Sequence, residues 1–301
     1  MTTKPTMTLI QLTERFSTEA SCKQFLQEQR WPNGVHCPRC KGAKVYALKS
    51  RPFHWTCKNE SCGGRNGYRF SVISKTVFEN TNYPLRIWFQ VIYLMTQSKK
   101  GISALQIHRQ IGSGDYRTAW YMCHRIRAAM QDSTFPKLMG EVEIDETYIG
   151  GSDKNRHASK RRNEHGPKGK LAVVGAIARK GNVVCQLIEA ADKHTLQSFV
   201  TRTVSEQVSL IATDEAAGYG NVNKAFPQHP HKTVNHAKKE YVRGNVHTGN
   251  IDSFWSLIKR GVMGTFHQVS KEYLPLYLAE FSYRHNNRKN PDIFTSVVAG
   301  C

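Results

Sequence analysis

Three aspartates stand where carboxylates can share a metal ion. Asp145 lies within the alternating stretch EVEIDETYIGG, Asp214 ends the apolar stretch SLIATD, and Asp252 lies in the first turn of a predicted helix, IDSFWSLIKRGV. Clustered carboxylates repel one another unless cations neutralise them. Oxygen ligands without cysteine or histidine nearby suit Mg²⁺ or Mn²⁺. Two such ions about 4 Å apart serve in-line phosphoryl transfer, which is the chemistry we expect here.

A lysine accompanies the third aspartate. Lys259 follows Asp252 by seven residues, so two helical turns place both on one face. We expect Lys259 to hold a phosphate beside the metal site. Taken singly, each aspartate also fits a structural role, as a turn residue at a strand end or as an acid favoured by the helix dipole.

Four of the eight cysteines form a second candidate metal site. Cys37 and Cys40 frame CPRC, Cys57 and Cys62 frame CKNESC, and sixteen residues separate the two pairs. This spacing is typical of a Cys₄ zinc ribbon, and four thiolates leave no open position, so the predicted zinc is structural. Disulfides are the alternative, which a reducing compartment disfavours. The other cysteines are interpreted as buried or incidental thiols.

The first 135 residues are predicted to hold a helix, the ribbon and a helical region. A helix over 8–30, with a possible interruption at 17–21, precedes two short strands around a turn at 50–52. Three helices follow over 84–98, 103–112 and 115–132. A glycine-containing turn before a helix with exposed arginines is typical of a helix-turn-helix, and an ordinary three-helix packing unit is the alternative. The arginines expected to contact DNA are Arg117, Arg125 and Arg127.

From Gly140 the pattern changes to strands. Three hairpin-connected strands are followed by helices alternating with strands, including a helix over 194–206 with Asp192 as its cap. This order predicts an α/β fold, a mixed sheet with helices on its faces, which is the order of a ribonuclease-H-like core. In such a sheet the first and fourth strands can be neighbours at the centre, and we expect this to bring Asp145 and Asp214 within reach of the same ion.

The chain is strongly basic. Its 301 residues contain 43 Lys and Arg against 23 Asp and Glu, a net charge of +20, which favours nucleic acid over an anionic membrane surface as the partner. The segment 151–170 alone holds seven basic residues against two acids, among them Lys160, Arg161 and Arg162. The apolar share excludes a disordered chain. Neither a transmembrane segment nor a signal peptide is recognised, so a cytoplasmic, nucleoid-associated protein is expected.

Four motifs resemble one family. CPRC…CKNESC, EIDETYIGG, TDEAAGY and the long block from Val234 to Arg288 resemble bacterial insertion-sequence transposases of the zinc-ribbon, ISXO-like DDE type. The resemblance implies a ribonuclease-H-like core that cleaves DNA and transfers strands at transposon ends. It makes Asp145 and Asp214 the first two acids of the catalytic triad.

The third acid departs from the family pattern. It is usually Glu in an Asn-x-Ile-Glu stretch, where this chain has GNIDSFW, so Asp252 takes that place and Asn250 is the alternative. The shorter Asp side chain fits either an active variant, which we favour, or a decayed copy. Lys259 matches the lysine that follows, and His236 matches a recurring histidine with no assigned role.

The resemblance and the residues together predict a DDE transposase. We expect Mg²⁺ or Mn²⁺ at the three aspartates, structural Zn²⁺, terminal inverted repeats and target DNA as partners, and at least a dimer on DNA. The expected domains are 1–80 (helix and zinc ribbon), 81–135 (helix-turn-helix-like) and 136–301 (catalytic). The alternatives are a non-catalytic or decayed DNA-binding regulator and a host nuclease of the same fold.

Overall fold

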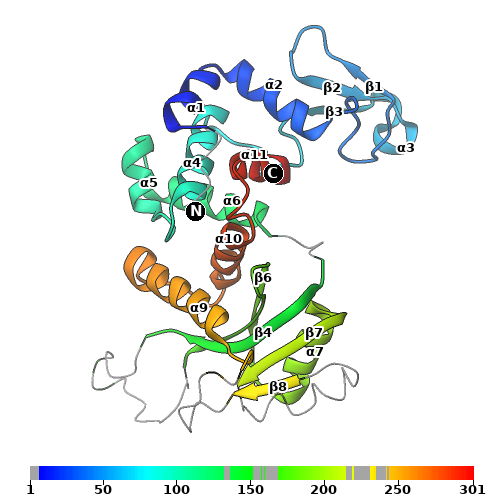
Figure 1. Ribbon diagram of the computed structural model, residues 1–301. Helices are drawn as coiled ribbons and strands as arrows, with labels where there is room; N and C mark the ends of the chain where they lie inside the picture. Colours follow the sequence, from blue (N-terminus) through cyan, green and yellow to red (C-terminus); the bar gives the residue numbers. More distant parts are fainter. Residues whose placement is uncertain are drawn as a thin grey trace. The chain divides into compact units, whose positions relative to one another are not determined.

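The chain forms two compact units in a computed structural model (Figure 1). The structure describes residues 7–131, 136–151, 157, 159, 169–214, 219, 231–234, 242 and 244–301. The first unit comprises Met1–Met130 with Asn287–Cys301, and the second comprises Gln131–Asn286. Among the described helices, none has the length and apolar character needed to cross a membrane.

Two helices, rather than one, begin the first unit. Helix α1 spans Leu9–Arg15 and helix α2 spans Glu19–Arg30. Thr18 separates them because its side chain accepts a hydrogen bond from the backbone N–H of Ser21 and so starts a new helix. The interruption that the sequence allows at 17–21 is therefore present.

The ribbon is a three-stranded antiparallel sheet in the order β1-β2-β3. Its strands are β1 Val45–Ala47, β2 His54–Cys57 and β3 Tyr68–Ser71, with the short helices α3 Glu60–Gly63 and η1 Gly64–Asn66 between β2 and β3. On one face Trp55 and Phe70 pack against Trp31, with ring centroids 5.3 Å and 6.0 Å from the Trp31 ring. This aromatic contact joins the ribbon to the end of α2.

Three helices and the C-terminal helix complete the first unit. The helices are α4 Leu85–Gln97, α5 Ala104–Ile111, α6 Tyr116–Ala129 and α11 Ile293–Gly300. Ser103 and Asp115 cap α5 and α6, which begin where the sequence predicts. The placement of α11 differs from the sequence-based assignment of 136–301 to one domain. The ring of Phe294 lies 5.8 Å from Phe16 and 5.5 Å from Phe89, so this buried aromatic contact holds α11 in the first unit.

The second unit is built on a five-stranded mixed sheet in the order β6-β5-β4-β7-β8 (Figure 1). The strands are β4 Leu138–Ile149, β5 Leu171–Ala178, β6 Val183–Ile188, β7 Val204–Asp214 and β8 His231–Val234. Strands β4, β5 and β6 are antiparallel, whereas β7 is parallel to β4 and to β8. This is the ribonuclease-H-like arrangement, and the first and fourth strands are neighbours as expected.

Helices cover both faces of this sheet. On one face, helix α7 Lys193–Thr203 packs its buried residues against Val142 and Ile144 of β4. On the other face, α9 Gly249–Gly261 and α10 Leu274–Asn286 pack against Val173 and Ile177 of β5, and the π-helix η6 Val262–Phe266 follows α9. Since side chains alternate along a strand, Glu143 and Asp145 of β4 face α9.

Candidate active site and metal centre

A group of three carboxylates lies at the centre of the second unit's sheet. Asp145 comes from β4 and Asp214 ends the neighbouring parallel strand β7. One carboxylate oxygen each from Asp145, Glu146 and Asp214 all lie within 4.8 Å of one another. The structure thus brings together the two aspartates that the sequence predicts as neighbours. It adds Glu146, which the sequence analysis missed although it directly follows Asp145.

The group is electrostatically strained. Burial, followed by the charges of Asp214, Asp252 and Glu146, raises the pKa of Asp145 to about 7. Burial and the charge of Asp214 also raise the pKa of Glu146 to about 7, against the effect of a hydrogen bond from Tyr219. The buried Tyr219 hydroxyl donates that bond to Glu146 Oε2 over 2.7 Å. Crowded oxygen ligands with unfavourable charge are what a hard divalent cation stabilises, so the donor set fits Mg²⁺ or Mn²⁺.

The third predicted acid lies beside this group. Asp252 is exposed in the first turn of α9, where Thr248 Oγ1 donates a hydrogen bond to its Oδ2 over 3.1 Å. Its charge reaches Asp145 and raises the pKa of that carboxyl. However, Asp252 is not part of the set within 4.8 Å. Lys259 is exposed on the same helix, two turns further on.

A buried glutamate fixes the start of α9. Glu143 is fully buried, and its carboxylate accepts hydrogen bonds from the backbone N–H groups of Asn250 and Ile251 over 2.8 Å and 3.2 Å. Arg179 Nε donates to it over 2.8 Å, and His247 Nδ1 lies 3.2 Å away. The sequence places Glu143 on one face of an alternating strand but gives no signal that it binds a helix end. This carboxylate connects β4 to the helix that carries Asp252.

Asn250, the alternative third position, contacts the same glutamate. Its side-chain Nδ2 donates to Glu143 Oε1 over 2.7 Å. The amide nitrogen is therefore committed to holding the helix start. A metal ion would bind an asparagine through Oδ1 rather than Nδ2, so Asn250 stays the alternative to Asp252 as the third position.

A second contact joins α9 to the candidate site. Trp255 Nε1 donates a hydrogen bond to Asp145 Oδ2 over 3.0 Å. The indole reaches the strand because Gly175, which pairs with Asp145 on β5, has no side chain. A Cβ at Gly175 would lie 2.6 Å from Trp255 Cη2. The indole therefore orients the Asp145 carboxylate and requires glycine opposite it.

Replacing Glu143 with alanine is expected to destabilise the second unit. The change removes the buried acceptor of the Arg179 Nε–H and of two helix N–H groups, which costs about 3–5 kcal/mol for a broken buried pair. Urea unfolding of the full chain measures the loss. The matched control is Glu141→Ala on the same strand, because Glu141 also pairs with Arg179 but is 38% exposed, and about 1 kcal/mol or less is expected. Equal losses for both variants would contradict the role given to Glu143.

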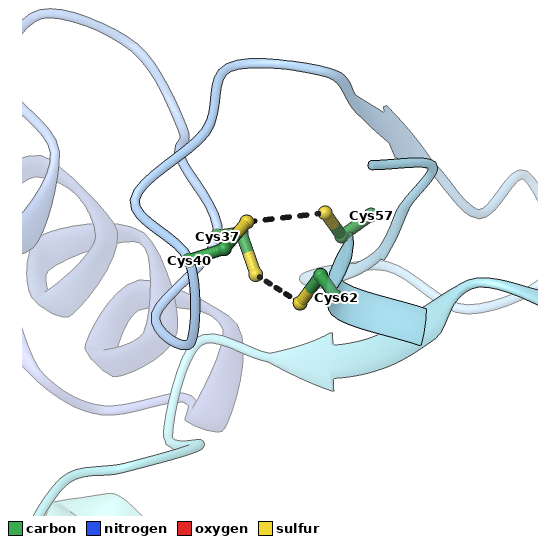
Figure 2. A group of neighbouring side chains, drawn as sticks. All are labelled: Cys37, Cys40, Cys57 and Cys62. Atoms are coloured by element: carbon green, nitrogen blue, oxygen red, sulfur yellow. Dashed lines mark hydrogen bonds between the residues drawn. The ribbon is translucent and has the colours of Figure 1, made fainter. Parts of the chain in front are cut away.

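The four ribbon cysteines converge on one point (Figure 2). The Sγ atoms of Cys37 and Cys62 are 3.6 Å apart, and those of Cys40 and Cys57 are 3.7 Å apart. A zinc ion with four Zn–S bonds of about 2.3 Å in a tetrahedron requires sulfurs about 3.8 Å apart. A disulfide requires about 2.05 Å, and all eight cysteines are free. The geometry fits the predicted zinc site and not the disulfide alternative.

The thiols of the ribbon differ in pKa. A hydrogen bond from the backbone N–H of Gly42 lowers the pKa of Cys40 to about 7, and Asn59 Nδ2 lies 3.7 Å from the same sulfur. Burial raises the pKa of Cys62 to about 12. A thiolate at Cys62 therefore needs a cation beside it, as a zinc site provides.

The second unit and the zinc-ribbon segment each match a known protein family. Residues 137–286 match the family model of the ISXO2-like transposase domain, ending at the last residue of the second unit, and residues 17–65 match that of the transposase zinc-ribbon domain. The chain belongs to the ISXO2-like transposase family. It is also 28% identical to an "Uncharacterized protein in transposable element ISH50" of Halobacterium salinarum. The alignment extends over 291 residues and covers 92% of this chain and 94% of that protein.

The predicted DNA-contacting arginines of this transposase-family chain differ in exposure. Arg117 is exposed near the start of α6. Arg125 is half-buried, and its Nη2 donates to the backbone carbonyl of Glu79 over 2.9 Å. Arg127 is only 1% exposed, so the expectation that all three are exposed is wrong for this residue. It lies on the face of α6 that packs within the unit, where its guanidinium cannot reach a DNA phosphate.

Several predicted residues of this family member lie outside the described part of the chain. They are three basic residues of the segment 151–170 and the recurring histidine: Lys160, Arg161, Arg162 and His236. The segment 215–225, for which the sequence predicts either helical or irregular structure, also lies outside the described residues, apart from the buried Tyr219.

Proposed function

We propose that this chain is a DDE transposase that cuts DNA at the ends of an insertion sequence and joins the freed strands to target DNA. The observation that carries the proposal is the carboxylate group of Asp145, Glu146 and Asp214 on adjacent central strands of a ribonuclease-H-like sheet. The family matches to both transposase domains support it.

The residues of the site have separate roles in binding metal ions and phosphate. Asp145 and Asp214 would hold divalent ions, and such ions would supply activation of the attacking oxygen and stabilisation of the leaving oxygen in phosphoryl transfer. Asp252 supplies the third carboxylate from α9, whose position Glu143 and Trp255 fix. Lys259, exposed on the same helix, holds a backbone phosphate beside the ions.

DNA is held mainly by basic surfaces. The zinc ribbon, with Zn²⁺ at its four cysteines, and helix α6 with Arg117 bind the terminal inverted repeats. The segment 151–170 adds backbone contacts that depend on salt and not on sequence. Because two ends must be joined, the active form is at least a dimer on DNA.

The proposal is tested with a labelled duplex that carries the element's end, incubated with the full chain, Mg²⁺ and a target plasmid. A transposase yields a strand cut at the end and a joined product with the plasmid. A host nuclease yields nicks without joined product. A regulator binds the duplex and leaves it intact. Either of the last two results would overturn the proposal.

Divalent ions are expected to stabilise the chain more at pH 8 than at pH 6. The pKa of about 7 for Asp145 and for Glu146 lies above the unfolded value, so the folded chain loses stability as the pH rises from about 4 through 7. At pH 8 Mn²⁺ relieves the repulsion of ionised carboxylates, whereas at pH 6 it must displace protons.

Thermal unfolding with and without Mn²⁺ measures this difference. We expect the midpoint to rise by about 3 °C or more at pH 8, equivalent to about 1 kcal/mol, and by less at pH 6. In Asp145→Asn the rise should be lost at both pH values. An equal rise at both pH values in the wild type would contradict the expected linkage.

A further inference from the structure

The two faces of the ribbon sheet differ. One is covered by the aromatic contact of Trp55 and Phe70 with Trp31. The opposite face is crossed by a row of paired residues, in which Tyr46 pairs with Thr56 and Thr56 pairs with Arg69. The Tyr46 side chain at one end of this row is 62% exposed.

A shallow hollow lies on this open face. Its lining includes the paired row together with Lys58, Asn66 and the neighbouring backbone of β1. A Cβ built at Gly67 would lie 2.8 Å from Thr56 Cγ2 and 3.4 Å from Lys58 Cδ, so the Lys58 stem runs along the same face as Thr56. We call Tyr46, Thr56, Lys58 and Arg69 the outer ribbon face.

The charge around the outer ribbon face has one sign. Residues 37–71 contain eight Lys and Arg against one acid, Glu60. Arg39 is used within the ribbon, since it lies 3.9 Å from the centre of the Tyr68 ring and donates to the Cys62 carbonyl. Lys58 and Arg69 are exposed, and within the described part of the chain neither forms an ion pair.

We propose that the outer ribbon face binds the backbone of duplex DNA. Lys58 and Arg69 contact phosphates, and Tyr46 packs its ring against a sugar or an exposed base edge between them. The inference rests on the proposed function, in which DNA is the substrate, and it names the surface of the first unit that holds it. Unpaired cations beside an exposed aromatic ring complement a polyanion that also has apolar surface, and duplex DNA offers both.

The double variant Lys58→Gln/Arg69→Gln tests the phosphate contacts. Fluorescence anisotropy with a labelled 30-base-pair end duplex gives Kd between 0.1 and 0.5 M NaCl. Losing two phosphate contacts should weaken binding about 25-fold near 0.15 M salt and lower the slope of log K against log salt by about 2. Tyr46→Ser should weaken binding about fivefold or more at any salt concentration.

A matched control separates local contacts from net charge. Lys180→Gln/Lys271→Gln removes two exposed cations from the second unit and should change Kd less than twofold. Zinc content of one ion per chain in each ribbon variant shows that the ribbon is folded. The same duplex sequence as RNA, and an acidic polypeptide, serve as competing ligands.

The outcomes separate the inference from the proposed function. Wild-type affinity and salt slope in the ribbon variants, with end cleavage intact, would overturn the inference and leave the proposed function standing. Preferential loss of RNA or acidic-polypeptide binding would overturn it as well. A wild-type chain that neither binds nor cuts the end duplex would overturn both. Selective weakening in the ribbon variants, with the control unchanged, supports it.

Discussion

Replacing Asp145 with asparagine is expected to lower the rate of Mg²⁺-dependent cleavage of an end-containing duplex by about 10³-fold or more. The change removes a charged ligand at the centre of the carboxylate group and keeps the shape of the side chain. Trp255 Nε1 keeps an oxygen acceptor, so α9 stays attached. Cleavage rates on a labelled duplex measure the loss.

The fold should survive this substitution. Burial and neighbouring charges raise the pKa of Asp145 to about 7, which means that its ionised form is unfavourable without a cation. A neutral asparagine removes that repulsion, so thermal stability in EDTA should be equal to or higher than that of the wild type at pH 8. Lost cleavage with an unchanged or raised unfolding midpoint identifies a metal ligand rather than a damaged fold.

Further variants test whether the loss of cleavage is specific to the carboxylate group. Asp192→Asn alters an aspartate that caps α7 in the same unit, and asparagine caps helices equally well, so cleavage should be unchanged. Asp252→Asn should reduce cleavage more than Asn250→Ser, since Asp252 is the acid whose charge reaches Asp145. Wild-type cleavage in Asp145→Asn would refute the proposed site.

Replacing Cys62 with serine is expected to cost the ribbon its zinc and its fold. A structural zinc contributes about 10–16 kcal/mol of apparent binding free energy. The ribbon's strands are only three to four residues long and bury few side chains, so little else holds them. Atomic absorption should give one zinc per wild-type chain and close to none in the variant.

Tryptophan fluorescence reports the same loss in structure. Trp31 and Trp55 pack together at the ribbon's covered face, so their emission should shift to the red when the ribbon unfolds. Cys301→Ser, at a free cysteine outside the cluster, is the control and should retain both zinc and spectrum. A Cys62→Ser chain with a full zinc complement and unchanged emission would contradict a Cys₄ site.

Local patterns in the sequence anticipated much of the fold. The spacing of CPRC and CKNESC predicted the cysteine cluster, because the two cysteines of each pair are only three and five residues apart and so stay close in space. Asp192 predicted where α7 begins, because a cap bonds only to the next turn, and the helices expected over 103–112 and 115–132 also begin where the sequence places them. The strand order placed β4 beside β7 and so brought Asp145 to Asp214.

Other features depend on contacts with no local signature. The alternation along β4 predicted that Glu143 and Asp145 share one face. It did not predict that this face contacts the start of a helix 107 residues later in the chain. Nor did it show that Gly175 leaves room for the Trp255 indole.

The sequence by itself therefore determined the elements and the ribbon cysteines, since turns, caps and strand periodicity act over a few residues. The order of those elements, typical of a ribonuclease-H-like core, indicated the pairing of Asp145 with Asp214. Only the tertiary structure decided that Glu146 joins the carboxylate group, that Arg127 is buried, and that α11 returns to the first unit. These outcomes depend on which surfaces meet when segments distant in the sequence pack together. The resulting burial, and not the spacing of residues, determines the protonation of each side chain and which groups it can contact.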